Sequence, residues 1–184
     1  MVTVTKRVTL EELERDGAPE GFWEVINGEL IEMPPASFEH SWIGMRIGRL
    51  IGNYVDAHRL GVVFGADGGV VLAKDPLTLR APDVGYVRHD RLPAASDAEV
   101  FLRVTPDLVV EIRSRFARSA PALAKAAMWL ESGTALVWLV DAEAETVTVF
   151  APQSGPRVVT MAETLDGGDI LPGFTLPVRD IFTQ

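Results

Sequence analysis

The clearest hydrophobic pattern in the chain is a pair of continuous apolar runs in its second half. Residues 108–110 and 135–140 are all apolar, which is typical of short strands that are buried on both faces of a sheet. Between them a helix is predicted from about residue 120 to residue 132. This crossover is long enough for the two strands to run parallel. Apolar and polar residues alternate over 146–150, which predicts a half-exposed neighbouring strand.

The first part of the chain carries the signals of a capped helix and a hairpin. Thr9 followed by Glu12 has the spacing of a capping box and predicts a short helix from about residue 9. Two apolar-rich runs at 22–26 and 29–33 flank Asn27-Gly28. Because both turn residues tolerate positive φ, this dipeptide predicts a tight β-hairpin.

A broad apolar stripe near the helical period predicts a long helix over residues 37–59. Further strands are expected at 62–64, 69–72 and 83–87, and a loop with at most a short helix at 88–104. Strands, a crossover helix and a further strand predict an α/β fold with a central mixed β-sheet flanked by helices.

Composition narrows the class of protein. The length favours a single domain over residues 1–184. There are no cysteines, so disulfides, thiolate metal sites and a cysteine nucleophile are excluded. No membrane span or secretory signal is visible, which favours a cytoplasmic protein. The net charge of −9 argues against a large non-specific nucleic-acid surface, although negative charge around a metal site would be offset by the cation.

Two carboxylates stand at the ends of predicted strands. Glu111 follows the apolar run at 108–110, and Asp83 opens the strand at 83–87. A carboxylate at such a position is costly to desolvate unless a partner pairs with it. Two of them can hold a hard divalent cation, Mg²⁺ or Mn²⁺, through oxygen ligands, provided that their strands pair. Glu24, in the first hairpin strand, is a third candidate acid.

These residue types suit phosphodiester hydrolysis. A cation held by carboxylates polarises a phosphate and lowers the pKa of a bound water. A nearby lysine orients that water or stabilises the developing negative charge. Asp83 and Glu111 are the candidate metal ligands, Lys125 is the candidate cationic group, and Glu24 could add a ligand or a base.

Other positions have simpler interpretations. Asp107 forms a second Pro-Asp pair, but in one strand it would lie about 13 Å from Glu111, too far to share an ion. His40 is more typical of a helix-start residue than of a ligand. Lys125 and Trp129 are predicted on the side of their helix opposite its apolar face, where Trp129 would cover the lysine stem.

Beyond this chemistry, Pro82-Asp83 followed by Glu111-Ile112-Arg113 resembles the PD…(D/E)-x-K pattern of restriction-endonuclease-like nucleases. A wider set of segments, from about residue 10 to residue 182, resembles the Uma-type restriction endonuclease family. These segments are Trp23-Glu24-Val25-Ile26-Asn27-Gly28-Glu29-Leu30-Ile31, His40, Arg80-Ala81-Pro82-Asp83-Val84, Pro106-Asp107-Leu108-Val109-Val110-Glu111-Ile112, Lys125 and Trp138-Leu139-Val140-Asp141.

The resemblance implies the restriction-endonuclease-like fold, a Mg²⁺-type site and DNA as substrate. It implies that Asp83 and Glu111 bind the metal and that Glu24 and Lys125 complete the catalytic set. The chain departs from the pattern at Arg113, which stands where the superfamily has lysine, and in the loop at 114–121. Arginine keeps its charge and serves poorly as a base. A homodimer is a further expectation, since cutting both strands of a duplex suits two-fold symmetry.

One alternative from another functional class remains open. The chain could be a catalytically inactive endonuclease-like protein whose acids form ion pairs, with Arg80 or Arg113 as partners of Glu111. It would then serve as an interaction or oligomerising protein through the helix at 37–59 or the loop at 88–104. Convergence of Glu24, Asp83, Glu111 and Lys125 in one pocket would distinguish the two hypotheses.

Overall fold

A computed structural model describes residues 3–17, 19–93, 100–115, 118–152 and 154–183. Its larger sheet has the strand order β11-β10-β9-β8-β7-β4. Its strands are β4 (Gly61–Gly65), β7 (Val84–Arg88), β8 (Leu108–Arg113), β9 (Leu136–Asp141), β10 (Thr146–Ala151) and β11 (Ser154–Val159). Strands β8 and β9 are parallel and their other neighbours are antiparallel, so the predicted mixed sheet is confirmed.

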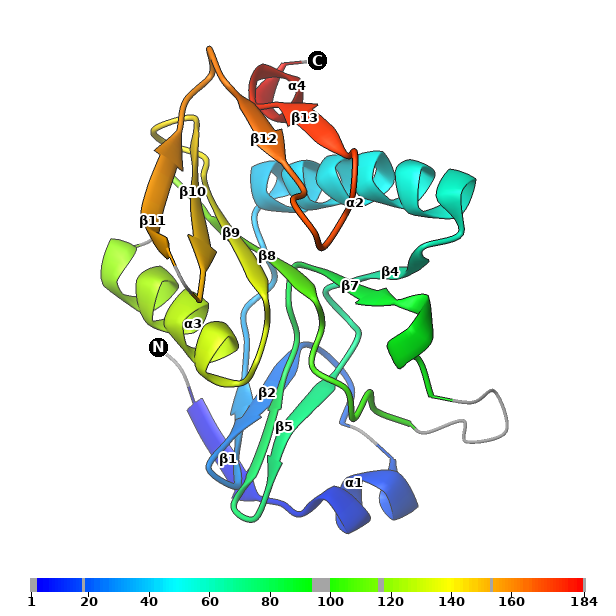
Figure 1. Ribbon diagram of the computed structural model, residues 1–184. Coiled ribbons are helices and arrows are strands. Elements are labelled where there is room, and N and C mark those ends of the chain that lie inside the picture. Colours follow the sequence, from blue (N-terminus) through cyan, green and yellow to red (C-terminus); the bar gives the residue numbers. More distant parts are fainter. Residues whose placement is uncertain (1–2, 18, 94–99, 116–117, 153, 184) are drawn as a thin grey trace.

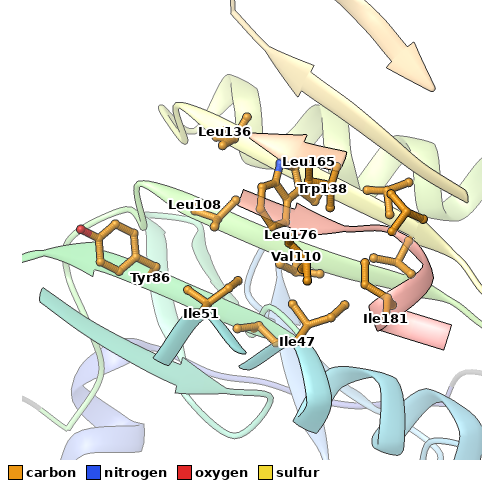
Figure 2. Packing of buried hydrophobic residues seen from close by; sticks show 14 of the residues in the cluster. Ile47, Ile51, Tyr86, Leu108, Val110, Leu136, Trp138, Leu165, Leu176 and Ile181 are labelled. Carbon is orange, nitrogen blue, oxygen red and sulfur yellow. The ribbon is translucent and has the colours of Figure 1, made fainter. Parts of the chain in front are cut away.

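Two helices cover opposite faces of this sheet (Figure 1). Helix α2 (Phe38–His58) begins after the capping residue Ser37, and helix α3 (Ser119–Glu131) is the predicted crossover between β8 and β9. Side chains of β8 alternate between the two faces. Leu108, Val110 and Ile112 join the core with α2, as Figure 2 shows for the first two, whereas Val109 packs in the cluster that contains α3.

A smaller antiparallel sheet lies at one end of the larger one, with strand order β1-β3-β2-β6-β5 (Figure 1). Its strands are β1 (Thr3–Arg7), β2 (Trp23–Ile26), β3 (Glu29–Glu32), β5 (Val70–Lys74) and β6 (Leu77–Arg80). The predicted hairpin is β2–β3, with φ of 50° at Asn27 and 80° at Gly28. Helix α1 (Leu10–Asp16) carries both hydrogen bonds of the predicted capping box.

The remaining elements are short: η1 (His89–Arg91), β12 (Thr164–Asp166), β13 (Thr175–Pro177) and α4 (Arg179–Phe182). The predicted loop at 88–104 begins with η1, and its residues 94–99 lie outside the described part of the chain. Residues 116–117 of the atypical loop at 114–121 also lie outside it. Among the described residues, no helix is both long and apolar enough to cross a membrane.

The chain passes from the smaller sheet to the larger one through Ala81-Pro82-Asp83, which joins β6 to β7. This crossing brings the ends of strands from both sheets to the same place. It therefore allows a side chain of β2 to meet side chains of the connecting segment, β8 and α3.

Candidate active site

Strand pairing places Asp83 beside Glu111. In the antiparallel pair β7–β8, Val84 lies opposite Val110. Asp83 precedes Val84 and Glu111 follows Val110, so the two acids occupy neighbouring positions. The backbone N–H of Ile112 donates to Asp83 Oδ2 at 2.7 Å and fixes the aspartate against β8. The pairing on which the sequence-based prediction depended is thus present.

Glu111 is a buried carboxylate with two donors. Its side chain points to the face that α3 covers and the residue is 5% exposed. Trp129 Nε1 donates to Oε1 at 2.6 Å, and Lys125 Nζ lies 3.0 Å from Oε2. Burial, with a smaller contribution from the charge of Asp83, raises the pKa of Glu111 to about 7, against the opposing effect of Lys125.

Lys125 points into the site and contacts three acceptors. Its Nζ lies 3.0 Å from Glu111 Oε2, 3.3 Å from Glu24 Oε1 and 3.0 Å from the carbonyl oxygen of Ala81. The contact with the Ala81 carbonyl oxygen is a hydrogen bond, and the contacts with the two carboxylates are ion pairs. Burial alone would lower the pKa of Lys125, but the charges of Glu111, Glu24 and Asp83 together raise it, and the side chain stays cationic.

The predicted orientation of α3 is corrected by this geometry. Of the residues assigned to the apolar face, Ala126 is buried as predicted, but Leu123 is 47% exposed, and the other buried residue of α3 is Trp129. Lys125 and Trp129 therefore face the sheet rather than the opposite side. They are four residues apart, hence neighbours on one helix face, and both contact Glu111.

Glu24 joins the site from the smaller sheet. It lies in β2, is 5% exposed, and pairs with Arg80 Nε at 3.0 Å as well as with Lys125. The N–H of Ala81 also donates to Glu24 Oε1 at 3.3 Å. Glu24 therefore ties the crossing segment to the lysine, and Arg80 balances its charge.

His40 contacts the site more closely than its sequence position suggested. Its Nε2 lies 3.1 Å from Asp83 Oδ2, so α2 supplies a partner to the aspartate through its first turn. The hydrogen bond to Asp83 raises the pKa of His40, against the effect of burial. The sequence did not predict the ion pair of Arg80 with Glu24 or the hydrogen bond of Trp129 to Glu111. It also favoured His40 as a simple helix-start residue, although its place in the first turn of α2 was a signal that it could lie near the site.

Asp107 and the arginines near the motif are engaged elsewhere. Asp107 accepts from the Arg88 N–H at 2.9 Å and pairs with Arg91 at 2.7 Å, which supports its rejection as a ligand. Arg113 pairs with Asp141 at 2.6 Å and with Glu143 at 3.1 Å. Arg115 pairs with Glu39 at 3.1 Å.

Because Arg113 serves an ion-pair network beside the site, Arg113→Gln should act on stability rather than on metal binding. The side chain is 10% exposed and makes charge-assisted hydrogen bonds to Asp141. We expect the free energy of unfolding to fall by about 1 to 3 kcal/mol, measured by urea denaturation. The affinity for Mn²⁺, measured by calorimetry, should stay within about twofold of wild type, since Asp141 and Glu143, the acids that pair with Arg113, are not the proposed metal ligands. A large loss of affinity would contradict this assignment.

The oxygen donors of the site fit a hard divalent cation. Among the described residues, the Ile112 N–H and His40 both contact Oδ2 of Asp83, which leaves Oδ1 to bind an ion, and Glu111 retains lone pairs on both oxygens. Burial is the main cause of the raised pKa of Glu111, and the charge of Asp83 adds to it, so a cation bound between the two acids would stabilise both carboxylates. Within the described ranges no group of three or more His, Cys, Asp or Glu side chains is placed so that it could hold a metal ion. Two carboxylates with water and phosphate in the other positions match the preference of Mg²⁺.

Comparison with known proteins identifies the family and supports the fold. Residues 9–179 match the family model Uma2, whose description is "Putative restriction endonuclease". No curated protein matches the chain. A crystal structure from Anabaena variabilis ATCC 29413, named a putative nuclease of DUF820, superposes with a TM-score of 0.80 at 23% identity, over 95% of this chain and 97% of that one. The predicted nuclease-like α/β fold is thereby confirmed, and the chain belongs to the Uma2 family.

Proposed function

We propose that the protein is a metal-dependent endonuclease of the PD-(D/E)XK type that hydrolyses DNA phosphodiester bonds. The observation that carries this proposal is the convergence of Asp83, Glu111, Lys125 and Glu24 from the connection between β6 and β7, from β8, from α3 and from β2. Four chain segments bring three carboxylates and one buried ammonium together. Membership of a family described as restriction endonucleases supports the same reaction class.

Asp83 and Glu111 would hold Mg²⁺ or Mn²⁺. Bound there, the ion polarises the phosphate and makes a bound water a stronger nucleophile. Glu111 must be deprotonated to serve as a ligand, and the donors Trp129 and Lys125 favour that form. His40 and the Ile112 N–H hold Asp83 Oδ2 and leave Oδ1 for the ion.

Lys125 acts in this proposal as a fixed positive charge. Its raised pKa makes it a poor base at neutral pH, and its role is to hold the attacking water and to stabilise negative charge on the phosphate oxygens. Glu24 orients Lys125 and binds Arg80. Arg113, which replaces the lysine of the superfamily pattern, takes no part because it pairs with Asp141.

The geometry favours this function over a non-catalytic interaction protein. An inactive relative would need its acids only as partners of structural cations, and Lys125 would be free to face solvent. Instead Lys125 is 20% exposed and lies between Glu24 and Glu111. Burying an ammonium between two carboxylates is seldom a net gain in stability over apolar packing, which points to a chemical use.

The test is a cleavage assay on supercoiled and linear duplex DNA with Mg²⁺, with Mn²⁺ and with a chelator. Cleavage is expected only with metal, and it should be lost in the double variant Asp83→Asn with Glu111→Gln. Asp67→Asn is the matched control, because Asp67 is an exposed carboxylate outside the site. Cleavage that persists in the double variant would refute the assignment of the site. Calorimetry with each metal, with and without a short duplex, would show whether DNA completes the metal site.

Other expectations accompany this proposal. A homodimer would present one site to each strand of a duplex, and sedimentation with and without DNA would test it. A cytoplasmic location stays a prediction from the sequence.

A further inference from the structure

Trp129 is a fully buried aromatic residue of α3, and its indole contacts the Glu111 carboxylate of the candidate site. It is 0% exposed and packs with Val109, Ala126 and Val137. Its indole N–H donates to Glu111 Oε1 at 2.6 Å. An indole has one donor and no acceptor, so this hydrogen bond satisfies its single polar group. Because the ring is enclosed by the core, the position of the N–H is set by packing.

Two donors of different kind, both from α3, hold the Glu111 carboxylate. Trp129 holds Oε1 and Lys125 holds Oε2 at 3.0 Å. The lysine brings a charge and is shared with Glu24 and Ala81. The indole brings no charge, does not titrate and has one partner. It therefore restrains the carboxylate without competing electrostatically with a cation.

We propose that Trp129 is a positioning residue, whose N–H fixes the plane of the Glu111 carboxylate so that its remaining lone pairs serve the cation shared with Asp83. This inference rests on the proposed function, because it assigns Glu111 to the metal. Residues that orient a ligand in this way commonly change metal affinity by about 10- to 100-fold when they are replaced.

The chain offers a matched control for this substitution. Trp138 in β9 is also 0% exposed, but it lies in the core cluster that includes α2, and in the described part of the chain its Nε1 has no hydrogen-bond partner. Trp129→Phe and Trp138→Phe therefore remove the same atoms from equally buried sites. Only Trp129→Phe removes a hydrogen-bond donor from a carboxylate.

We expect Trp129→Phe to weaken Mn²⁺ binding by about tenfold or more in calorimetry, whereas Trp138→Phe stays within about twofold of wild type. Trp129→Tyr, which keeps a donor on the ring, should recover most of the loss. Thermal unfolding of all three variants checks that they are folded under the assay conditions. Equal metal affinities for Trp129→Phe and wild type, or equal losses in both Phe variants, would overturn the proposal.

A second measurement is independent of metal. The chain has four tryptophans, so its proton–nitrogen NMR spectrum should show four indole signals, and the one lost in Trp129→Phe is assigned to Trp129. In the presence of chelator, this signal should move in Glu111→Ala and stay in Asp67→Asn. An unmoved signal would refute the contact. If wild type bound no metal but the signal moved, the metal-based function would fail while the restraint of Glu111 by Trp129 would stand.

Discussion

Replacing Lys125 with methionine is expected to lower the free energy of unfolding by about 3 to 5 kcal/mol, because it leaves the buried Glu111 carboxylate without its cation, while Glu24 keeps its ion pair with Arg80. Lys125 lies 3.0 Å from Glu111 and 3.3 Å from Glu24, and both acids are 5% exposed. Methionine fills a similar volume but offers no donor. The effect would be measured by urea denaturation at pH 8, where Glu111 is ionised in wild type.

The control for this substitution is Lys74→Met, because Lys74 is exposed at the end of β5. A change within about 0.5 kcal/mol is expected there. In the double variant Lys125→Met with Glu111→Gln, part of the loss should be recovered, since the unpaired buried charge is gone. Equal stabilities for Lys125→Met and wild type would show that the lysine is not engaged as the structure describes.

Local signals in the sequence predicted the elements that position the site. Asn27-Gly28 specified the hairpin that carries Glu24, and the capping box specified the start of α1. The apolar run before Glu111 predicted a strand buried on both faces. Each of these predictions depends on a few neighbouring residues, for which turn geometry and desolvation give direct rules.

Strand pairing was harder to predict because it depends on distant segments. The sequence allowed Asp83 and Glu111 to meet only if their strands paired, and the register that brings them together is set by the whole sheet. The sequence likewise did not show that Glu24 lies in a separate sheet, or that Ala81-Pro82-Asp83 crosses between the two sheets.

The orientation of α3 was predicted wrongly in part, and the reason is physical. A count of apolar residues favoured the face with Leu123, Ala126, Ala127 and Leu130, of which Ala126 is buried, because it treated Lys125 as a polar residue that faces water. Burial of Lys125 is stabilised by Glu24 and Glu111, which belong to other elements. Hydrophobic periodicity places polar residues on the side of a helix that faces water. A polar residue that has buried ion-pair partners faces the core instead, and the sequence near that residue does not reveal partners in distant segments.

The affinity for Mg²⁺ or Mn²⁺ is expected to rise by about 100-fold between pH 5 and pH 8, with the steepest change below pH 7. In the metal-free protein burial raises the pKa of Glu111 to about 7. Below that pH most molecules carry a neutral Glu111 that must release a proton before it can bind the ion. The affinity therefore falls as pH decreases through 7 and levels off above it.

His40 titrates in the same direction. Its pKa is raised by Asp83, and the protonated ring both occupies Asp83 Oδ2 and repels a cation. His40→Gln should therefore reduce the pH dependence of the metal affinity, and the part of that dependence that comes from Glu111 should remain. Asp67→Asn should reproduce the wild-type curve. Calorimetry in buffers of different ionisation enthalpy would count the protons released, and circular dichroism would verify folding at each pH.

An affinity that is constant from pH 5 to pH 8, with binding still lost in Glu111→Gln, would show that the carboxylate is already ionised at pH 5. That result would mean that its two donors, Trp129 and Lys125, outweigh the effect of burial.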